Sequence, residues 1–278
     1  MSFFADYSTV YAVRELQIGS ASDKRDSAIA QLITSTSRQI DAICQRCFAP
    51  RIETQLYDVP GGDSLVFDED LLEVIALTNG DGSTISSSDY RLYPLNASAK
   101  NKLVLKPSTG SLFKSDDSGD PDGAISLQAV FGYHDRYSAA WVDVGAALAG
   151  TLNSSSTSIP GIATQLVRSG QLIRIGTEYL YVRSVAINAT AGDTLTVARG
   201  ANGSTAAAHN ISDAIEVWSS PMIEDLATMA VVAYNRLKDN PIGESVNVGG
   251  NVFTTPKDVQ AWIAKRCREL ALVRGSFF

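Results

Sequence analysis

Apolar and polar positions along the chain follow two different periods, which separate helical ends from a β-patterned middle. Between residues 23 and 46, apolar side chains recur every three or four positions, which predicts a helix that buries one face. The same spacing recurs at residues 223–237 and 259–273, and each of these runs follows a Ser/Thr-Pro helix start. Shorter runs complete this pattern. They predict a helix at 9–16 and strands at 54–59, 72–77, 90–93, 103–105 and 125–131.

A Ser/Thr/Gly-rich stretch, residues 151–219, has a strand pattern of its own. Residues 170–182 predict a hairpin with Gly176-Thr177 as its turn, because glycine adopts positive φ readily. Further strands are expected at 194–198 and 214–218. We therefore expect an α+β fold: a mainly helical frame with short strands, residues 1–150 and 220–278, that carries an inserted small all-β module, residues 151–219.

Composition agrees with an ordinary globular protein. The chain has 278 residues, of which 45% are hydrophobic, so it can bury the core of one large domain or two small ones. The net charge of -7, with acidic and basic residues interspersed, argues against tight binding to a phosphate backbone. The N-terminal residues do not resemble an export signal, and no apolar run approaches the length of a membrane span. We expect no membrane association.

The residues able to bind metals or perform redox chemistry are few. Cys44, Cys47 and Cys267 are an odd number of cysteines, which favours a reducing compartment over a disulfide framework. Cys44 and Cys47 fall at the end of a helical pattern, the wrong end for lowering a thiol pKa, and no second pair completes a zinc site. The acidic loop at residues 107–123 lacks the terminal glutamate of a calcium loop and is expected to be exposed and mobile. We predict no metal and no cofactor.

No group of residues has the spacing of a catalytic site. His134 and Asp135 are adjacent in sequence, which does not orient an imidazole against a nucleophile. Glu69, Asp70 and Glu73 include the acid pair that glycoside hydrolysis requires, but their spacing is equally typical of a solvated turn. We expect a protein that is not an enzyme.

Three segments share the order and spacing of motifs in a known family. Residues 23–57 contain Ser37-Arg38-Gln39-Ile40-Asp41, Cys44-Gln45-Arg46 and Phe48-Ala49-Pro50. Later come a short strand that ends in Val130-Phe131-Gly132-Tyr133 and a closing pair of helices bridged by a Gly-Gly loop. Together these segments resemble the head-to-tail connector (adaptor) proteins of long-tailed double-stranded DNA bacteriophages.

The resemblance implies a structural protein of the virion neck, assembled in the host cytoplasm. Connectors of this type form a closed ring of about twelve copies beneath the portal protein, each copy presenting a different face to either neighbour. The ring extends the DNA channel and offers a docking surface to the next neck protein. Genomic DNA is expected to pass through the lumen without sequence-specific binding, because an acidic lining repels the phosphates weakly along the whole channel.

Two segments are candidate partner surfaces. Family members commonly reach the portal with their C-terminal segment, and this chain ends in two aromatic residues suited to a partner's pocket. The connection between the last two helices, residues 240–254, is long and alternates small with apolar residues, which suits contact with a neighbouring subunit or the lumen. The predicted portal-binding residues are Arg274, Gly275, Ser276, Phe277 and Phe278. The predicted residues of the inter-subunit or lumen loop are Glu244, Val246, Val248, Gly249, Gly250, Val252 and Phe253.

Two other classes of protein stay open. A tail-completion or baseplate protein shares ring symmetry and small β modules. A receptor- or glycan-binding accessory is a further hypothesis, in which the insert binds sugars through Tyr179, Tyr181 and Trp218, although aromatic residues on period-two strands more often pack in a core. Residues 199–209 resemble a loop that recurs in accessory β modules of phage structural proteins. We expect the insert to touch the frame little and to lie on the outer side of the ring.

Overall fold

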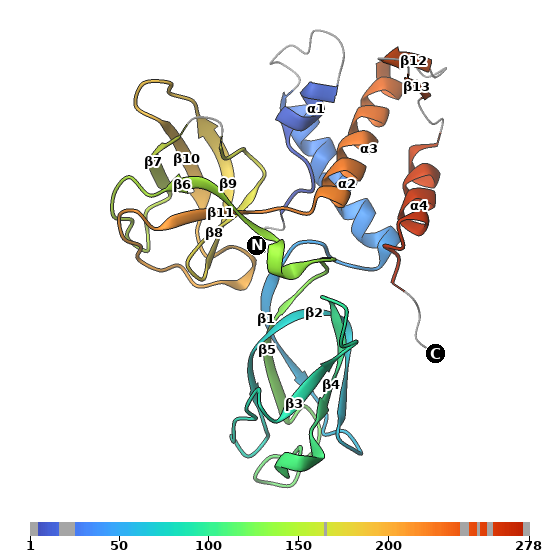
Figure 1. Ribbon diagram of the computed structural model, residues 1–278, viewed down its shortest axis with the longest axis vertical. Coiled ribbons are helices and arrows are strands. Elements are labelled where there is room, and N and C mark those ends of the chain that lie inside the picture. The colour runs from blue at the N-terminus through green and yellow to red at the C-terminus, as the bar shows by residue number, and fades with distance from the viewer. Residues whose placement is uncertain are drawn as a thin grey trace.

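The protein is divided into one helical lobe and two β lobes (Figure 1). The computed structural model describes residues 5–16, 26–163, 166–239, 245–248, 251–254 and 258–274. Antiparallel sheets of five and six strands make the protein mainly β, with 33% strand against 26% helix. The expected mainly helical frame is therefore wrong, because the strands of the first 150 residues build a lobe of their own instead of decorating a helical one.

The helical lobe brings together the two ends of the chain. In the described residues its helices are α1 (Val10–Leu16), α2 (Asp26–Cys44), α3 (Pro221–Asp239) and α4 (Val259–Glu269). The apolar stripe predicted for α2 is confirmed, since Ile29, Ile33 and Ile40 are buried against the other helices. The N-terminal cap of α4 is Asp258, whose Oδ1 accepts from the Ala261 N–H at 2.9 Å. None of the described helices has the length and hydropathy needed to cross a bilayer.

The five-stranded lobe encloses its own apolar core. Its strands are β1 (Arg51–Tyr57), β2 (Ser64–Thr78), β3 (Tyr90–Tyr93), β4 (Lys100–Leu105) and β5 (Ile125–Phe131). The order β1-β5-β2-β4-β3 leaves β1 and β3 at the edges. Strand β2 pairs with β4 through its first half and with β5 through its second, and the register shifts between Val66 and Leu71. The bend at this shift lets one long strand serve both halves of the lobe.

The six-stranded lobe has the order β6-β11-β8-β9-β10-β7 and a separate core. Its strands are β6 (Trp141–Ala147), β7 (Ser158–Ile162), β8 (Leu172–Ile175), β9 (Glu178–Ala186), β10 (Asp193–Ala198) and β11 (Ala214–Trp218). The predicted hairpin turn at Gly176-Thr177 is confirmed by the pairing of Ile175 with Glu178. Strand β6, which the sequence did not predict, precedes residue 151, so the sheet takes strands from both sides of that position.

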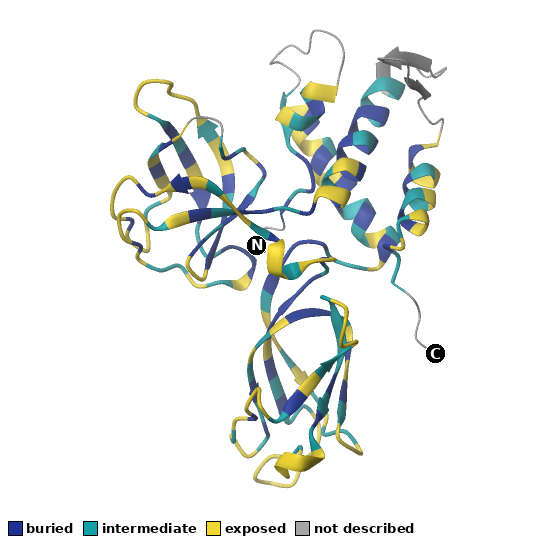
Figure 2. Ribbon diagram, viewed as in Figure 1, coloured by how far each residue is buried: buried dark blue, intermediate teal, exposed yellow. Residues whose placement is uncertain are grey.

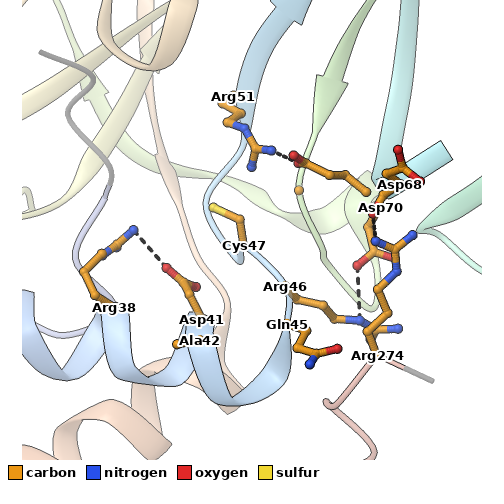
Figure 3. A pocket seen from close by; sticks show the side chains of 12 residues that line it. Arg38, Asp41, Ala42, Gln45, Arg46, Cys47, Arg51, Asp68, Asp70 and Arg274 are labelled. Carbon is orange, nitrogen blue, oxygen red and sulfur yellow. Dashed lines mark hydrogen bonds and ion pairs between the residues drawn. The ribbon is translucent and has the colours of Figure 1, made fainter. Parts of the chain in front are cut away.

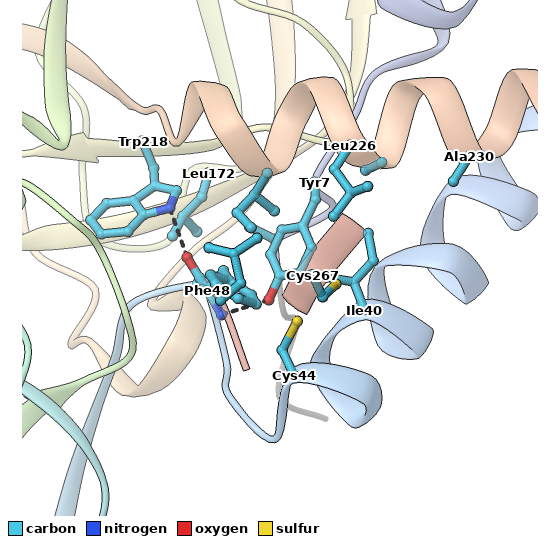
Figure 4. Close-up of a cluster of buried hydrophobic side chains, with 14 of the residues drawn as sticks. Tyr7, Ile40, Cys44, Phe48, Leu172, Trp218, Leu226, Ala230 and Cys267 are labelled. Carbon is cyan, nitrogen blue, oxygen red and sulfur yellow. Dashed lines mark hydrogen bonds between the residues drawn. The ribbon is translucent and has the colours of Figure 1, made fainter. Parts of the chain in front are cut away.

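A shared apolar core joins the three lobes where they meet (Figures 2 and 4). Phe48, in the segment between α2 and β1, lies at its centre and is 1% exposed. The Phe48 N–H donates to the Tyr7 hydroxyl at 2.8 Å, and the Phe48 carbonyl accepts from the Trp218 indole N–H at 3.1 Å. Leu172 of β8 and Leu226 of α3 complete the contact around it. The six-stranded lobe therefore shares a core with the rest of the chain more closely than the sequence suggested.

The loop at residues 199–209 owes its shape to one buried carboxylate. Glu178 is 0% exposed and accepts hydrogen bonds from Arg199 Nε and Nη2, each at 2.7 Å, and from His209 Nε2 at 2.7 Å. The backbone N–H groups of Gly200 and Ala207 also donate to it. Burial disfavours the charged form, but these hydrogen bonds outweigh it and lower the pKa of Glu178 to about 2. The carboxylate thus fixes both ends of the loop.

The tip of this loop docks on the five-stranded lobe. The Asn202 side-chain amide donates to the Pro50 carbonyl at 2.9 Å. Gly203 has a φ of +80°, and a Cβ added there would lie 2.0 Å from the Ile52 carbonyl oxygen. Only glycine allows both the backbone conformation and the close approach to β1.

We predict that Gly203→Ala destabilises the protein far more than Gly176→Ala. The second glycine has a φ of +60° but open space around it, so alanine there costs only the backbone strain, about 1 kcal/mol. At Gly203 the clash with β1 adds to that strain, and the expected loss is about 3 kcal/mol or more. Urea unfolding monitored by far-UV circular dichroism measures both variants, and equal losses would contradict the docked loop.

Candidate functional site

A charged groove of about 450 Å³ lies where the end of α2 meets β2 (Figure 3). Its titratable lining is balanced in charge, with four arginines and four carboxylates. The arginines come from α2, from the segments that follow it and from the C-terminal region, whereas most of the carboxylates come from the bend in β2. These charged residues are Arg38, Arg46, Arg51, Arg274, Asp41, Asp68, Glu69 and Asp70.

Ion pairs cross the groove between the helical and five-stranded lobes. Arg46 Nε lies 3.1 Å from Asp70 Oδ2, and its guanidinium stacks 4.1 Å from the centre of the Tyr133 ring. Within the five-stranded lobe, Arg51 of β1 pairs with Glu69 of β2 and with Glu53 at 2.9 Å. Burial raises the pKa of Asp70, against the attraction of nearby arginines. The sequence left a solvated turn open for the acids of this segment; the structure places them on β2 and pairs two of them with arginines.

Two segments of the family resemblance meet beside the groove, where Cys47 and Gly132 line it. The Tyr133 N–H donates to the Cys47 carbonyl at 2.7 Å, and the rings of Phe48 and Tyr133 meet edge to face with centroids 5.6 Å apart. Gly132 has a φ of +139°, and a Cβ there would lie 2.7 Å from the Ala49 carbonyl oxygen. The Phe-Ala-Pro and Phe-Gly-Tyr motifs, about 80 positions apart in sequence, therefore make one structural unit.

Asp41 connects the groove to the shared core. Its Oδ1 accepts from the Tyr7 hydroxyl at 2.5 Å, and its Oδ2 pairs with Arg38 at 2.9 Å. Burial raises the pKa of Asp41 to about 6, even though Arg38 and the Tyr7 hydroxyl both favour the ionised form. Desolvation is the larger effect at this position.

Arg274 places the predicted portal-binding tail at the rim of the groove. Its backbone N–H donates at 2.9 Å to the carbonyl of Cys44, the last residue of α2, which would otherwise lack an intrahelical partner. Its guanidinium donates to the carbonyls of Phe67, at 3.0 Å, and Asp68. The side chain is thus engaged within the chain. Gly275, Ser276, Phe277 and Phe278 lie outside the described residues.

The predicted inter-subunit loop contains a hairpin of β12 (Ser245–Val248) and β13 (Asn251–Thr254). Val246 pairs with Phe253, and the two strands form a sheet of their own. The hairpin lies near the end of α3 that is farthest from both β lobes (Figure 1). Val248 and Val252 are on these strands, whereas Glu244, Gly249 and Gly250 lie outside the described residues.

The aromatic residues considered for sugar binding are mostly packed inside. Tyr179 is 3% and Trp218 7% exposed, which confirms the core role favoured from the sequence. Both rings contact Trp141, with centroids 5.0 and 5.1 Å away. The Tyr181 hydroxyl donates to Asp6 at 3.1 Å. These contacts place the three aromatic side chains at the joint between lobes.

His134 and the cysteines also lie at this joint. His134 Nδ1 accepts from the Arg136 N–H at 2.9 Å, so its Nε2 carries the proton and donates to the Ser219 carbonyl at 2.8 Å. Cys44 and Cys267 are buried free thiols in the shared core. In the described part of the chain, no group of three or more His, Cys, Asp or Glu side chains is placed to hold a metal ion.

We predict that Asp41→Asn changes how stability depends on pH. An aspartate with a folded pKa of about 6 and an unfolded value of about 3.9 stabilises the fold below pH 4 and loses that contribution as the pH rises through 6. The wild type minus Asp41→Asn difference in unfolding free energy should fall by about 2 kcal/mol between pH 4 and 7. Urea titrations at a series of pH values measure it, with Asp68→Asn as an exposed control on the same groove. A difference that is flat or rises with pH would contradict this account.

Comparison with known proteins assigns no family to the chain. No protein-family model matches it, and no curated protein matches its sequence. Function is therefore inferred from the motifs and from the geometry of the junction, the groove and the hairpin.

Proposed function

We propose that this chain is a structural protein of a bacteriophage neck, a head-to-tail adaptor that assembles as a ring beneath the portal protein. The main support is the unit formed by the Phe48-Ala49-Pro50 and Phe131-Gly132-Tyr133 segments. Both segments carry the resemblance to the connector family and are distant in sequence, yet Tyr133 packs on Phe48 and its N–H donates to the Cys47 carbonyl. Motifs that depend on each other structurally are a stronger basis for a resemblance than motifs that merely share an order.

The charged groove and the tail beside it form the proposed portal-docking surface. Arg274 fixes the chain at the groove rim, so residues 275–278 begin next to a surface that carries both signs of charge. Arginines and carboxylates on such a surface can form ion pairs with a partner instead of with each other. Pairs of this kind fix the orientation of the two proteins and speed their association more than they raise the affinity. The two terminal aromatic residues would supply the apolar anchor.

The β12–β13 hairpin is the proposed contact between subunits. A two-stranded hairpin is marginally stable alone in water, and both of its edges expose unpaired backbone groups. In the described residues its strands pair only with each other. A neighbouring subunit in the ring would supply the missing contacts, and the lumen is the alternative environment.

Electrostatics fits a channel through which DNA slides. Residues 51–136, which include the five-stranded lobe, contain 14 carboxylates and 7 basic side chains, so they account for the whole net charge of -7. A duplex that passes this lobe meets weak repulsion, and the four arginines of the charged groove beside it are balanced by four carboxylates. The next neck protein would dock on the face of the ring opposite the portal.

We predict that removing residues 275–278 abolishes portal binding without unfolding the subunit. Loss of a buried aromatic anchor should weaken binding at least about 30-fold. Affinity capture with the portal protein of the same phage measures it, and Ser276→Ala is the matched control that keeps both aromatic residues. Unchanged capture by the shortened chain would reject the tail as the anchor. Capture of tail-tube protein instead of portal would favour a tail-completion protein.

A second prediction concerns ring closure. Val248→Asp combined with Phe253→Asp places charge on the hairpin that we assign to the subunit contact, so rings should no longer close while the subunit stays folded. Negative-stain electron microscopy of the protein assembled with portal shows the rings, and circular dichroism checks the fold. Asn247→Asp is the control for added charge on the same strand. Intact rings from the double variant would exclude the hairpin from the interface.

A further inference from the structure

A second open cavity, of about 510 Å³, lies between the outer face of the five-stranded sheet and the six-stranded lobe. Its floor is aliphatic, from β1, β2 and β5, and its opposite wall is the β8–β9 turn with the tip of the 199–209 loop. Glu73 and Arg174 are its charged lining residues. We refer to this cavity as the interlobe cleft.

Glu73 carries the uncompensated charge of the interlobe cleft. Arg174 is neutralised by Glu216, with Nε 2.7 Å and Nη2 2.6 Å from Oε2, and is held 4.7 Å above the Trp141 ring. Glu73 Oε2 accepts from the Tyr137 hydroxyl at 2.9 Å, a neutral donor. Among the described residues no lysine or arginine forms an ion pair with Glu73. An exposed carboxylate on an apolar floor is suited to a long basic side chain, whose stem covers aliphatic surface while its head pairs with the acid.

The surroundings of the cleft strengthen this preference. The five-stranded lobe that supplies the floor belongs to the segment with 14 carboxylates against 7 basic side chains. Summed charge of one sign raises the local concentration of an oppositely charged partner and speeds its encounter. The partner should therefore present a basic face.

Helix α4 of this same chain presents such a face. Ala261, Lys265 and Arg268 lie on one side of the helix and are exposed. The Lys265 side chain is 71% exposed, and its ion pair with Glu269 is long, at 3.7 Å. Among the described residues no carboxylate forms an ion pair with Arg268. The small side chain of Ala261 leaves room for close approach along the same stripe.

Helix α4 and the lobe that walls the cleft lie on opposite sides of the helical lobe. In Figure 1, α4 is on the side of the helical lobe that faces away from the six-stranded lobe, whose β8–β9 turn forms a wall of the cleft. A closed ring of identical subunits needs two different and complementary surfaces on the same chain. A basic helix on one side and an acidic cleft on the other meet that requirement.

We propose that α4 of one copy docks on the interlobe cleft of the next copy, with Arg268 directed at Glu73. This inference rests on the proposed ring and names its subunit interface. The contact is electrostatic at its rim and aliphatic beneath, so it should weaken as salt screens the charges. The subunit interface then has two parts: the β12–β13 hairpin at the end of α3, and α4 in the interlobe cleft of the next copy.

A charge-exchange experiment tests the pairing. Arg268→Glu and Glu73→Lys should each weaken self-association about tenfold at about 50 mM salt, equivalent to about 1.4 kcal/mol, and the double variant should recover most of the loss. Analytical ultracentrifugation and electron microscopy with portal provide the readouts, and circular dichroism checks that each variant is folded. Arg91→Glu, the same change at an exposed position on β3, is the control and should associate like the wild type.

The outcomes separate this inference from the proposed function. Wild-type rings that tolerate both single variants, or folded double variants that fail to recover, would overturn the α4–cleft contact and leave the adaptor proposal standing. A wild-type chain that forms no ring with portal at any salt concentration would overturn both. A third outcome would also reject the contact between copies: the basic face of α4 binds duplex DNA, and Glu73→Lys has no effect on ring assembly.

Discussion

The position of Phe48 is the constraint on which the rest of the structure depends. Its backbone N–H and carbonyl bond Tyr7 and Trp218, residues that belong to the N-terminal segment and to the last strand of the six-stranded lobe. Its ring packs on Tyr133 at the end of β5. Full burial of a phenylalanine stabilises a fold by about 1.5–3 kcal/mol, but here the same residue also sets where three lobes meet. The groove and the interlobe cleft both exist because the lobes are fixed at this angle.

Local patterns predicted the elements of the protein better than their assembly. The stripe on α2, the start of α3 at Pro221 and the Gly176-Thr177 turn all depend on neighbouring residues, and the structure confirms them. Strand β6 was missed because its pairing partner β11 is about 70 positions away and its own exposure pattern does not alternate. The balance of helix and strand was wrong for the same reason: residues 51–131 contain enough short strands for a lobe, and only long-range pairing reveals that they form one.

The candidate sites illustrate the same limit. Nothing in the sequence places Arg46 beside Asp70 or Arg274 beside Phe67, since these contacts depend on the bend in β2 and on the path of the C-terminal segment. The glycine at position 132 was the available signal, because a glycine between two aromatic residues marks a place where backbones approach closely. Buried charges such as Asp41 and Glu178 have opposite pKa shifts because the number of hydrogen bonds to each differs, which no spacing rule foresees.

The loop tip on β1 has a consequence for the evolution of this architecture. Accessory β domains are often exchanged between proteins as cassettes, with only two linkers to match. Here a donor lobe would also have to bring the Asn202-Gly203 tip to fit the Pro50 and Ile52 carbonyls, and an indole to reach the Phe48 carbonyl. Exchange of the lobe for one without these groups would therefore leave the carbonyls without their contacts. The six-stranded lobe and β1 beneath it should be inherited as a unit.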